Sequence, residues 1–412
     1  MNSTTSATKR RKILLLSVSA GAGHTRAAEA LKAYATGYPD IDIVHWDAMA
    51  YVSAGFRAIY TDFYLHLVNR HPTVWGYVYQ KSDCAHPDAT MQKLRRMMER
   101  VSTRKLRAAV NHYAPDAIIC THFLPAEMLS REISNQRLAC PVWVQVTDFD
   151  LHSMWLQPQM KGYFAASEEI AFRMRAKAIP ATSIYVTGIP VMPAFSQELR
   201  RATCAARFGL DPLRPIVLLM SGGAGIGELD KTVESLLAIK GNGLERDFQL
   251  VALAGKNIEL LNSLQQIAAR HPQRLKACGF SHEVEKLMAC ADLVITKPGG
   301  LTTSECLAIG VPMIIHSPIP GQEERNADYL LEQGAALKAV DLTALSYRLQ
   351  MLLQQPHLLA QLRQRCHALG RPHAGLAVLS IVFSHLDRQQ GAPVLPTFTL
   401  LPPVQTSCLQ AH

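Results

Sequence analysis

The sequence predicts an α/β protein built on parallel sheets, and three observations lead to that prediction. Short apolar runs alternate with amphipathic segments along most of the chain, which is the pattern of strand followed by helix. Two of the apolar runs lead into glycine-rich turns, SAGAGH at 19–24 and SGGAGIG at 221–227. Between them, GIPVMPAF at 188–195 carries two prolines and a glycine and is typical of a hinge. Together these features predict two Rossmann-like domains that face each other.

Composition narrows the class of protein. The 412 residues are enough for two domains, and 48% hydrophobic with 18% charged residues indicates a globular chain. No apolar run reaches the ~18 to 20 residues that span a bilayer, and the longest, GLAVLSIVF at 375–383, fits a buried helix. Nine scattered cysteines without a C-x-x-C pair indicate reduced thiols in a cytosolic protein and no zinc site. A net charge of +9 favours an anionic partner: a nucleic acid, a nucleotide or an anionic membrane.

The first element admits three interpretations. A basic start, a short apolar run and small residues in KRRKILLLSVSAGAGHTRAAEAL, 9–31, are typical of a secretory signal peptide. Glycines that open a helix are typical of a phosphate-binding or nucleotide-binding turn, and the third interpretation is an ordinary strand and helix. Apolar residues recur at helical spacing directly after the glycines, which favours a fold unit over a signal peptide. We therefore expect a strand at 13–17, a turn at 19–23 and a helix from residue 25 onward.

The remaining elements continue the alternation. In the first half, further strands are expected at 43–46, 117–120, 142–147, 163–165 and 184–187. The second half restarts with the apolar run before the second glycine turn, and its later strands are expected at 250–254, 275–278, 293–296 and 312–316. Each connection between parallel strands needs a crossover, which the amphipathic segments supply as helices.

These elements divide the chain into two domains and two ends. The N-terminal domain is expected at 12–190, and the C-terminal domain with its closing helices at 191–387. The basic residues 1–11 and the proline-rich residues 388–412 are expected to be a disordered start and a flexible tail.

The first glycine turn is a candidate anion site. Glycines at 21 and 23 let the backbone approach a ligand, and a helix start offers unpaired N–H groups to an anion. The stretch fits neither G-x-x-x-x-G-K-[ST] nor the full G-x-G-x-x-G pattern, which argues against a P-loop ATPase and a dinucleotide site. His24 stands where the helix begins, where imidazolium is disfavoured, so we expect a neutral side chain that can accept a proton. A histidine that only caps or packs is an equally weighted alternative.

The most informative stretch is 294–337. After a strand that ends at Lys297, glycines and threonines at 299–303 open a helix and place N–H groups and hydroxyls at a phosphate. Glu305, one turn further on, has a carboxylate able to grip vicinal hydroxyls. The next polar loop offers an amide and a carboxylate at 322–323, the groups used to hold sugar hydroxyls. A helix-surface carboxylate is the alternative interpretation of Glu305.

These motifs resemble a known family. TKPGGLTTSECLAIGVPM followed by PIPGQEERNADYL is similar to the donor-binding half of glycosyltransferase family 28. Within it, the resemblance is to the monogalactosyldiacylglycerol synthases and the bacterial processive diacylglycerol glucosyltransferases. SAGAGHTRAAEAL resembles their glycine–histidine loop, VTDFDLHSMWLQPQMKGYFAAS their T-D segment, and YVTGIPVMPAF their hinge. The resemblance runs from about residue 12 to 340, loosely over 40–115, and implies a GT-B fold with a metal-independent active cleft between the two domains.

The resemblance also implies roles for individual residues. Gly299, Gly300 and Thr302 would bind the diphosphate of UDP with help from Gly222 and Gly223, and Glu305 would take the ribose hydroxyls. Phe280 and Ser281 would flank the uracil, and Gln322 and Glu323 would hold the transferred hexose. His24, beside Gly23, would face the acceptor hydroxyl or the donor phosphate, Asp148 would be a second candidate base, and His122 is a third polar group at the rim.

The resemblance thus implies an inverting hexosyltransferase of glycolipid biosynthesis. It would move glucose or galactose from a UDP-sugar, with no cofactor, to the hydroxyl of diacylglycerol. Inversion needs a base on the acceptor hydroxyl, and the sequence leaves open whether His24 or Asp148 is that base. Transfer to a polyprenyl-linked or other lipid is the alternative within enzymes. A non-enzymatic nucleic-acid-binding protein is disfavoured, because the basic residues do not interleave with exposed aromatic residues.

A lipid acceptor implies contact with a membrane. MQKLRRMMERVSTRKLRAAV at 91–110 is a basic amphipathic segment whose Arg95, Arg96 and Arg100 suit an anionic surface. Trp75 lies upstream in an aromatic stretch suited to the headgroup level. A packed helix with a solvated face is the alternative interpretation. We expect a cytoplasmic protein held peripherally at the inner face of the cell membrane.

Overall fold

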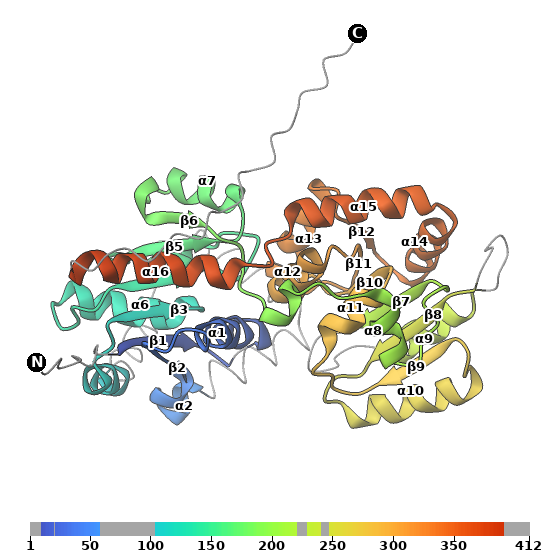
Figure 1. Cartoon of the computed structure of the whole chain (residues 1–412), viewed down its shortest axis with the longest axis horizontal. Coiled ribbons are helices and arrows are strands. Elements are labelled where there is room, and N and C mark those ends of the chain that lie inside the picture. The colour runs from blue at the N-terminus through green and yellow to red at the C-terminus, as the bar shows by residue number, and fades with distance from the viewer. Residues whose placement is uncertain (1–9, 20, 58–103, 221–228, 240–246, 391–412) are drawn as a thin grey trace, which may run out of the picture.

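Two parallel six-stranded sheets form the framework of the protein, seen here in a computed structural model (Figure 1). The structure describes residues 10–19, 21–57, 104–220, 229–239 and 247–390. The expected α/β class is confirmed, and so is the division into two sheets, one in each half of the chain. Within the described residues, no helix combines the length and apolar character needed to cross a bilayer.

The first sheet has the strand order β2-β1-β3-β4-β5-β6. Its strands are β1 (Arg11–Ser17), β2 (Ile41–Asp47), β3 (Ala117–Cys120), β4 (Val142–Gln145), β5 (Gly162–Ala165) and β6 (Ile184–Val186). Its described helices are α1 (Ala22–Ala35), α2 (Ala54–Arg57), α6 (Phe123–Ser134) and α7 (Glu168–Ala176). The register pairs Ser17 with Asp47 and Leu16 with Cys120, so the carboxyl ends of these strands meet at one edge.

The second sheet has the order β12-β11-β10-β7-β8-β9. Its strands are β7 (Ile216–Met220), β8 (Gln249–Leu253), β9 (Leu275–Cys278), β10 (Leu293–Thr296), β11 (Met313–His316) and β12 (Ala336–Ala339). Its described helices are α8 (Arg201–Arg207), α9 (Leu229–Leu237), α10 (Ile258–Arg270), α11 (Val284–Cys290), α12 (Gly300–Ile309), α13 (Gln322–Glu332), α14 (Leu342–Gln354) and α15 (Pro356–Leu369).

The central strands are apolar on both faces, because helices cover both sides of each sheet. In β1, Ile13 and Leu15 pack in one apolar cluster, while Leu14 and Leu16 pack in another on the opposite face. This alternation is typical of a buried parallel strand, which reads as a continuous apolar run in the sequence. The cluster that holds Leu14 continues through the hinge residue Val191 into the second domain, so the two domains share apolar packing.

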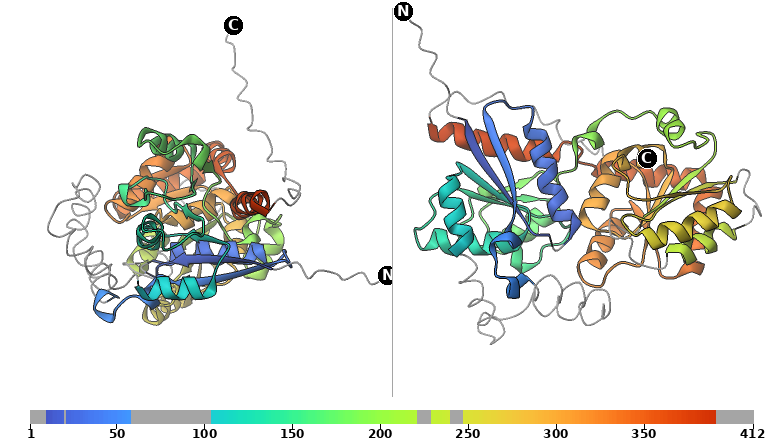
Figure 2. Two further views of the ribbon diagram at one scale, coloured as in Figure 1. Left: turned by 90° about the vertical axis from the view of Figure 1, so that its left-hand side faces the viewer. Right: turned by 90° about the horizontal axis from the view of Figure 1, so that it is seen from below.

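The last helix, α16 (Ala374–Gln390), returns to the first domain. Figures 1 and 2 show it in red, lying along the first sheet rather than the second. Its apolar face, with Val382 and Phe383, joins the cluster of Ile13 and Leu15, and its Asp387 forms a buried ion pair with Arg11. The buried helix expected at 375–383 is confirmed. The domain boundaries at residues 190 and 387 stay a prediction. The structure shows that α16 completes the core of the first domain.

The chain therefore passes between the domains twice, and the two passages lie side by side. Gly188 has φ of +86°, and a Cβ there would lie 2.6 Å from Cβ of Arg371, so this crossing leaves no room for a side chain. The hydroxyl of Tyr34 on α1 donates to the carbonyl of Pro372 at 3.1 Å, which ties the second passage to the first domain.

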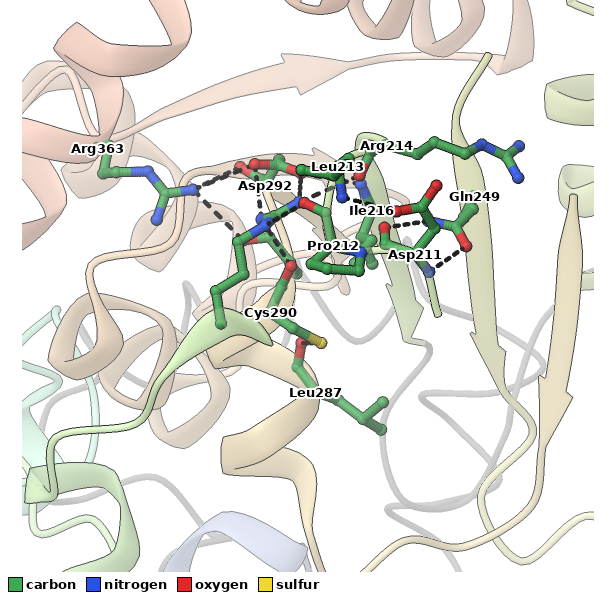
Figure 3. Close-up of polar contacts among 12 residues, drawn as sticks. Asp211, Pro212, Leu213, Arg214, Ile216, Gln249, Leu287, Cys290, Asp292 and Arg363 are labelled. Carbon is green, nitrogen blue, oxygen red and sulfur yellow. Dashed lines mark hydrogen bonds and ion pairs between the residues drawn. The ribbon is translucent and has the colours of Figure 1, made fainter. Parts of the chain in front are cut away.

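A polar network holds the amino ends of β7 and β10 in the second sheet (Figure 3). Arg201 on α8 holds Asp292 with two hydrogen bonds of 2.9 and 2.8 Å, and Asp292 also accepts from the backbone N–H of Ile216, the first residue of β7. Arg363 on α15 donates to the backbone carbonyl of Asp292 at 3.3 Å. Bidentate charge-assisted contacts of this kind give rigidity, so they stabilise the amino ends of β7 and β10. The loops of the candidate site follow the carboxyl ends of the strands, at the opposite edge of the sheet.

Differences from the sequence prediction are small and have local causes. Helix α1 begins at Ala22 instead of residue 25, so Gly23 lies in its first turn. Strand β4 ends at Gln145, two residues earlier than expected, because the chain turns there toward the second domain. Strand β12 was not predicted, since its sequence ALKA is too short to show a pattern. Each described cysteine is a free thiol, as expected.

Candidate active site

The carboxyl ends of the two sheets face each other, and the candidate site lies where they meet. Helix α1 contacts helix α12 across this boundary, and a Cβ on Gly23 would lie 3.7 Å from Cβ of Leu301. The contact at Gly300 is closer still. A Cβ on that residue would overlap the carbonyl oxygen of Thr147 and lie 3.0 Å from its carbon. The first turn of α12 and the loop after β4 therefore touch backbone to backbone, which only glycine allows at position 300.

His24 is held in one orientation by backbone and side-chain oxygens. Its Nδ1 lies 3.1 Å from the carbonyl oxygen of Thr121 and 2.7 Å from Oγ1 of Thr147. Because a carbonyl oxygen only accepts, the neutral ring carries its proton on Nδ1 and leaves Nε2 as the basic nitrogen. Burial lowers the pKa of His24 to about 4, so the imidazole is neutral near pH 7. The expectation of a neutral histidine that can accept a proton agrees with this environment.

Two aromatic rings of the first domain lie beside His24. The His122 ring lies edge-on at 4.5 Å between centroids, and the Trp155 ring lies at 6.1 Å. His122 is buried, and its Nδ1 accepts from the backbone N–H of Leu124 at the start of α6. His122 is therefore an N-cap with its ring against His24, instead of an open polar group at the rim.

Asp148 lies on the same loop as the Thr147 that contacts His24. The carboxyl is buried, and the side-chain amide of Gln322 on α13 donates to its Oδ1. Burial raises the pKa of Asp148 to about 6, while the hydrogen bond from Gln322 opposes that rise. Asp148 is thus ionised above about pH 6, and both candidate bases are unprotonated near neutrality.

The second domain contributes the starts of α12 and α13 to this boundary. Glu323 accepts from the backbone N–H of Ile319 at 2.7 Å, and its Oε1 would lie 3.8 Å from a Cβ on Gly299. Thr302 is half-buried in the first turn of α12. Glycines 299 and 300, Thr302, Gln322 and Glu323 are therefore brought together as the sequence predicted, although Gln322 faces Asp148 here.

Glu305 lies one turn inside α12 and is 8% exposed. Its carboxylate makes no hydrogen bond to the part of the chain that the structure describes. Burial raises the pKa of Glu305 to about 7, and the nearby Arg26 on α1 pulls it back. A buried carboxylate with unused acceptor positions is the arrangement expected of a group that binds hydroxyls.

Phe280 and Ser281 follow β9. The Phe280 ring is 50% exposed and has the ammonium of Lys256 5.4 Å from its centroid. Ser281 instead caps its own loop by accepting from the N–H of Glu283 at 3.1 Å. An exposed aromatic ring at this edge is available for stacking, whereas the Ser281 hydroxyl is already used.

Several predicted residues lie outside the described residues: Gly222 and Gly223 of the second glycine turn, and Trp75, Arg95, Arg96 and Arg100 of the proposed membrane segment. Over the described ranges, no group of three His, Cys, Asp or Glu side chains is placed to hold a metal ion.

Three residues that approach this site were missed in the sequence. Thr147 orients His24, Arg26 faces Glu305, and Asn326 on α13 accepts from the N–H of Phe149 at 2.8 Å. Thr147 and Asn326 stand inside the motifs singled out above. Their partners, His24 on α1 and Phe149 in the loop after β4, lie 123 and 177 residues away in the chain, so no local pattern marks them.

Comparison with known proteins agrees with this architecture. The family model of monogalactosyldiacylglycerol (MGDG) synthase matches residues 24–191, and that of the glycosyltransferase family 28 C-terminal domain matches residues 216–364. Processive diacylglycerol beta-glucosyltransferase of Bacillus pumilus is 28% identical over 289 residues, which are 70% of this chain and 73% of that protein. The enzyme of the same name from Bacillus cereus strain AH187 is 26% identical over 88% of this chain and 91% of its own length.

Solved structures share the fold. MurG of Acinetobacter baumannii superposes with a TM-score of 0.60 at 16% identity, covering 90% of this chain and 99% of its own. The complex of S. aureus MnaA with UDP has a TM-score of 0.59 at 13% identity, covering 93% and 99%. The chain has the GT-B fold, and the two family matches show that it is a glycosyltransferase. More narrowly, the chain belongs to glycosyltransferase family 28, with an N-terminal domain of the MGDG synthase type.

The contact between Gly300 and Thr147 can be tested with two adjacent glycines. Gly300→Ala adds a methyl group where the Thr147 carbonyl lies, so the domains must separate or the helix start must shift. We expect it to lower the free energy of unfolding by ~1 to 3 kcal/mol, the usual effect of overpacking. Gly299→Ala is the matched control, because its new methyl group would meet its nearest neighbour at 3.8 Å. Chemical denaturation measures both, and equal stabilities would contradict the close contact.

Proposed function

We propose that this protein transfers a hexose from a UDP-sugar to the hydroxyl of diacylglycerol, with inversion at the anomeric carbon. The observation that carries the proposal is the juxtaposition of two sets of groups across one boundary. Two unprotonated bases, His24 and Asp148, stand on the first domain, and the helix starts of α12 and α13 stand opposite. Relatives that carry the name diacylglycerol glucosyltransferase support the acceptor, and solved neighbours in complex with UDP support the donor.

The chemistry assigns each group a task. The base accepts the proton of the acceptor hydroxyl while that oxygen forms a bond to the anomeric carbon. The bond from this carbon to the phosphate oxygen breaks, and UDP leaves with the electron pair. Backbone N–H groups at the start of α12 stabilise the charge that develops on the diphosphate. In this proposal Glu305 holds the ribose, Gln322 and Glu323 hold the hexose, and no metal or cofactor takes part.

Product analysis tests the function directly. Purified protein is incubated with UDP-glucose or UDP-galactose and vesicles that contain either diacylglycerol or a polyprenyl phosphate. We expect a β-linked hexosyl-diacylglycerol by mass spectrometry and NMR, with turnover unchanged by EDTA. If product forms only with the polyprenyl lipid, that lipid is the acceptor and diacylglycerol is not. Loss of turnover in EDTA would contradict the metal-free mechanism. The preferred hexose is read from the same assay.

Donor binding is tested at Glu305. Glu305→Ala should weaken UDP binding by ~1 to 3 kcal/mol, because it removes charge-assisted hydrogen bonds to the ribose. Since burial raises the pKa of Glu305 to about 7, UDP affinity of the parent should also fall as pH drops below 7, and the variant should lose that dependence. Glu332→Ala, an exposed glutamate at the C-terminal end of α13, is the control. Titration calorimetry measures these affinities, and equal affinities in all three proteins would remove Glu305 from the donor site.

The identity of the base is tested by the acid limb of the pH–rate profile. A base works only when unprotonated, so turnover falls as pH drops through its pKa. Burial sets that pKa at about 4 for His24 and at about 6 for Asp148. A midpoint near 6 therefore assigns Asp148, and a midpoint near 4 assigns His24. Substitution of the residue assigned in this way, by His24→Ala or Asp148→Asn, should lower turnover ~10²- to 10⁴-fold. UDP affinity should stay within a few-fold of the parent.

The remaining part of the proposal is contact with an anionic membrane surface. In this proposal the protein acts at the cytoplasmic face of the cell membrane. Arg104, Arg107, Asn111 and Arg137 line a surface depression of about 590 Å³ on the first domain. Arg107 is engaged by Glu132 at 3.0 Å, while Arg104 and Arg137 are exposed. Arg104 belongs to the basic segment 91–110 predicted from the sequence, and Arg137 adds a second exposed positive charge to the same depression.

Vesicle sedimentation tests this part. The double variant Arg104→Glu with Arg137→Glu should bind phosphatidylglycerol vesicles at least about tenfold more weakly at low salt, because each basic residue contributes ~1 kcal/mol at an anionic surface. Arg270→Glu, an exposed arginine on α10 of the other domain, is the control and should bind as the parent does. Binding that is the same on neutral vesicles and insensitive to salt would contradict an electrostatic attachment.

A further inference from the structure

One face of helix α13 contacts the loop that follows β4 residue by residue. The contacts come from residues at positions i, i+3, i+4 and i+7 of the helix, which share a face. They are Gln322, Arg325, Asn326 and Tyr329, and they meet Asp148, Phe149 and Asp150. The helix belongs to the second domain and the loop to the first, so this contact joins the two halves of the site.

The middle of the contact is buried and specific. Asn326 is fully buried, and its Oδ1 accepts from the backbone N–H of Phe149 at 2.8 Å. The Phe149 ring stacks on the Tyr329 ring at 4.8 Å with 17° between the planes. A buried N–H that loses its acceptor is costly, so the conformation of the loop at Phe149 depends on the presence of α13.

The end of the contact is a shared carboxylate. Asp150 is 3% exposed and forms ion pairs at 3.2 Å with two arginines. Arg173 comes from α7 of the same domain, and Arg325 comes from α13 across the boundary. A buried carboxylate that loses a charged partner is strongly destabilised, so Asp150 favours the arrangement in which Arg325 is in place.

The loop held in this way carries the groups proposed for catalysis. Thr147 contacts Nδ1 of His24, and Asp148 is the other candidate base. The same helix begins with Gln322 and Glu323, the proposed hexose contacts. We propose that Arg325, Asn326 and Tyr329 are positioning residues. They belong to the donor domain and order the acceptor-side loop, so that the two candidate bases take their catalytic positions only when the domains are closed. This inference rests on the proposed function for its catalytic meaning, but its physical core is the contact itself.

Two arginines on one carboxylate allow a matched experiment. Arg325→Gln removes the partner of Asp150 that crosses the boundary, and Arg173→Gln removes the partner within the first domain at the same distance. Hydrogen exchange of peptides that span 146–152 reports on the Phe149 amide in the full chain without any substrate. We expect exchange about tenfold faster in Arg325→Gln, the effect of losing one charge-assisted contact, and exchange within about twofold of the parent in Arg173→Gln.

Kinetics separate positioning from donor binding. Arg325→Gln should lower kcat about tenfold with little change in KM for the UDP-sugar, Arg325→Lys should recover most of that loss, and Arg173→Gln should leave both constants as in the parent. Asn326→Ala is a second variant on the same contact and should show the same exchange and kcat pattern. Equal exchange in the two glutamine variants, or a raised KM with unchanged kcat, would overturn the inference. A parent that transfers no hexose to diacylglycerol would overturn the proposed function alone, because the exchange experiment needs no acceptor.

Discussion

The carbonyl group of Thr147 lies so close to the backbone of Gly300 that position 300 has no room for a side chain, and the rest of the site depends on this contact. It fixes how near the start of α12 comes to the loop after β4. At that separation, Gln322 reaches Asp148 and Asn326 reaches the Phe149 amide. Helix starts that attract anions are thereby held opposite groups that accept protons. A transfer reaction with a charged leaving group requires that arrangement.

Burial has the same electrostatic effect on three titratable groups at this boundary, His24, Asp148 and Glu305. It lowers the pKa of His24 and raises the pKa of both Asp148 and Glu305, so each group is shifted toward its neutral form. The environment of each group then modulates the shift: Thr121 supports the protonated form of His24, and Arg26 favours the carboxylate of Glu305. Shifts of this kind gather at functional sites because the site excludes water before the reaction begins.

The sequence was sufficient for the parts of the fold that local patterns encode. Continuous apolar runs such as ILLL in β1 mark strands buried on both faces, and glycine turns followed by amphipathic stretches mark α1 and α12. Local patterns also predicted a helix at 375–383, but not that α16 would pack on the first sheet, because that depends on partners more than 200 residues away in the chain. The pairing of Gln322 with Asp148 was missed for the same reason. Each residue was predicted as a site residue separately, and the contact exists only when the two domains meet.

Because α16 completes the core around Ile13 and Leu15, the first domain is discontinuous in the chain. During synthesis on a ribosome, residues 11–186 emerge long before Val382 and Phe383, so the part of this face that α16 covers beside α1 stays open while the second domain is made. The second domain can close its own core in that interval, since its strands and helices are contiguous. The order of folding therefore runs against the order of translation: the domain that begins the chain finishes last. Apolar surface left open for that time favours aggregation, so α16 is also the element that removes this surface at the end of synthesis.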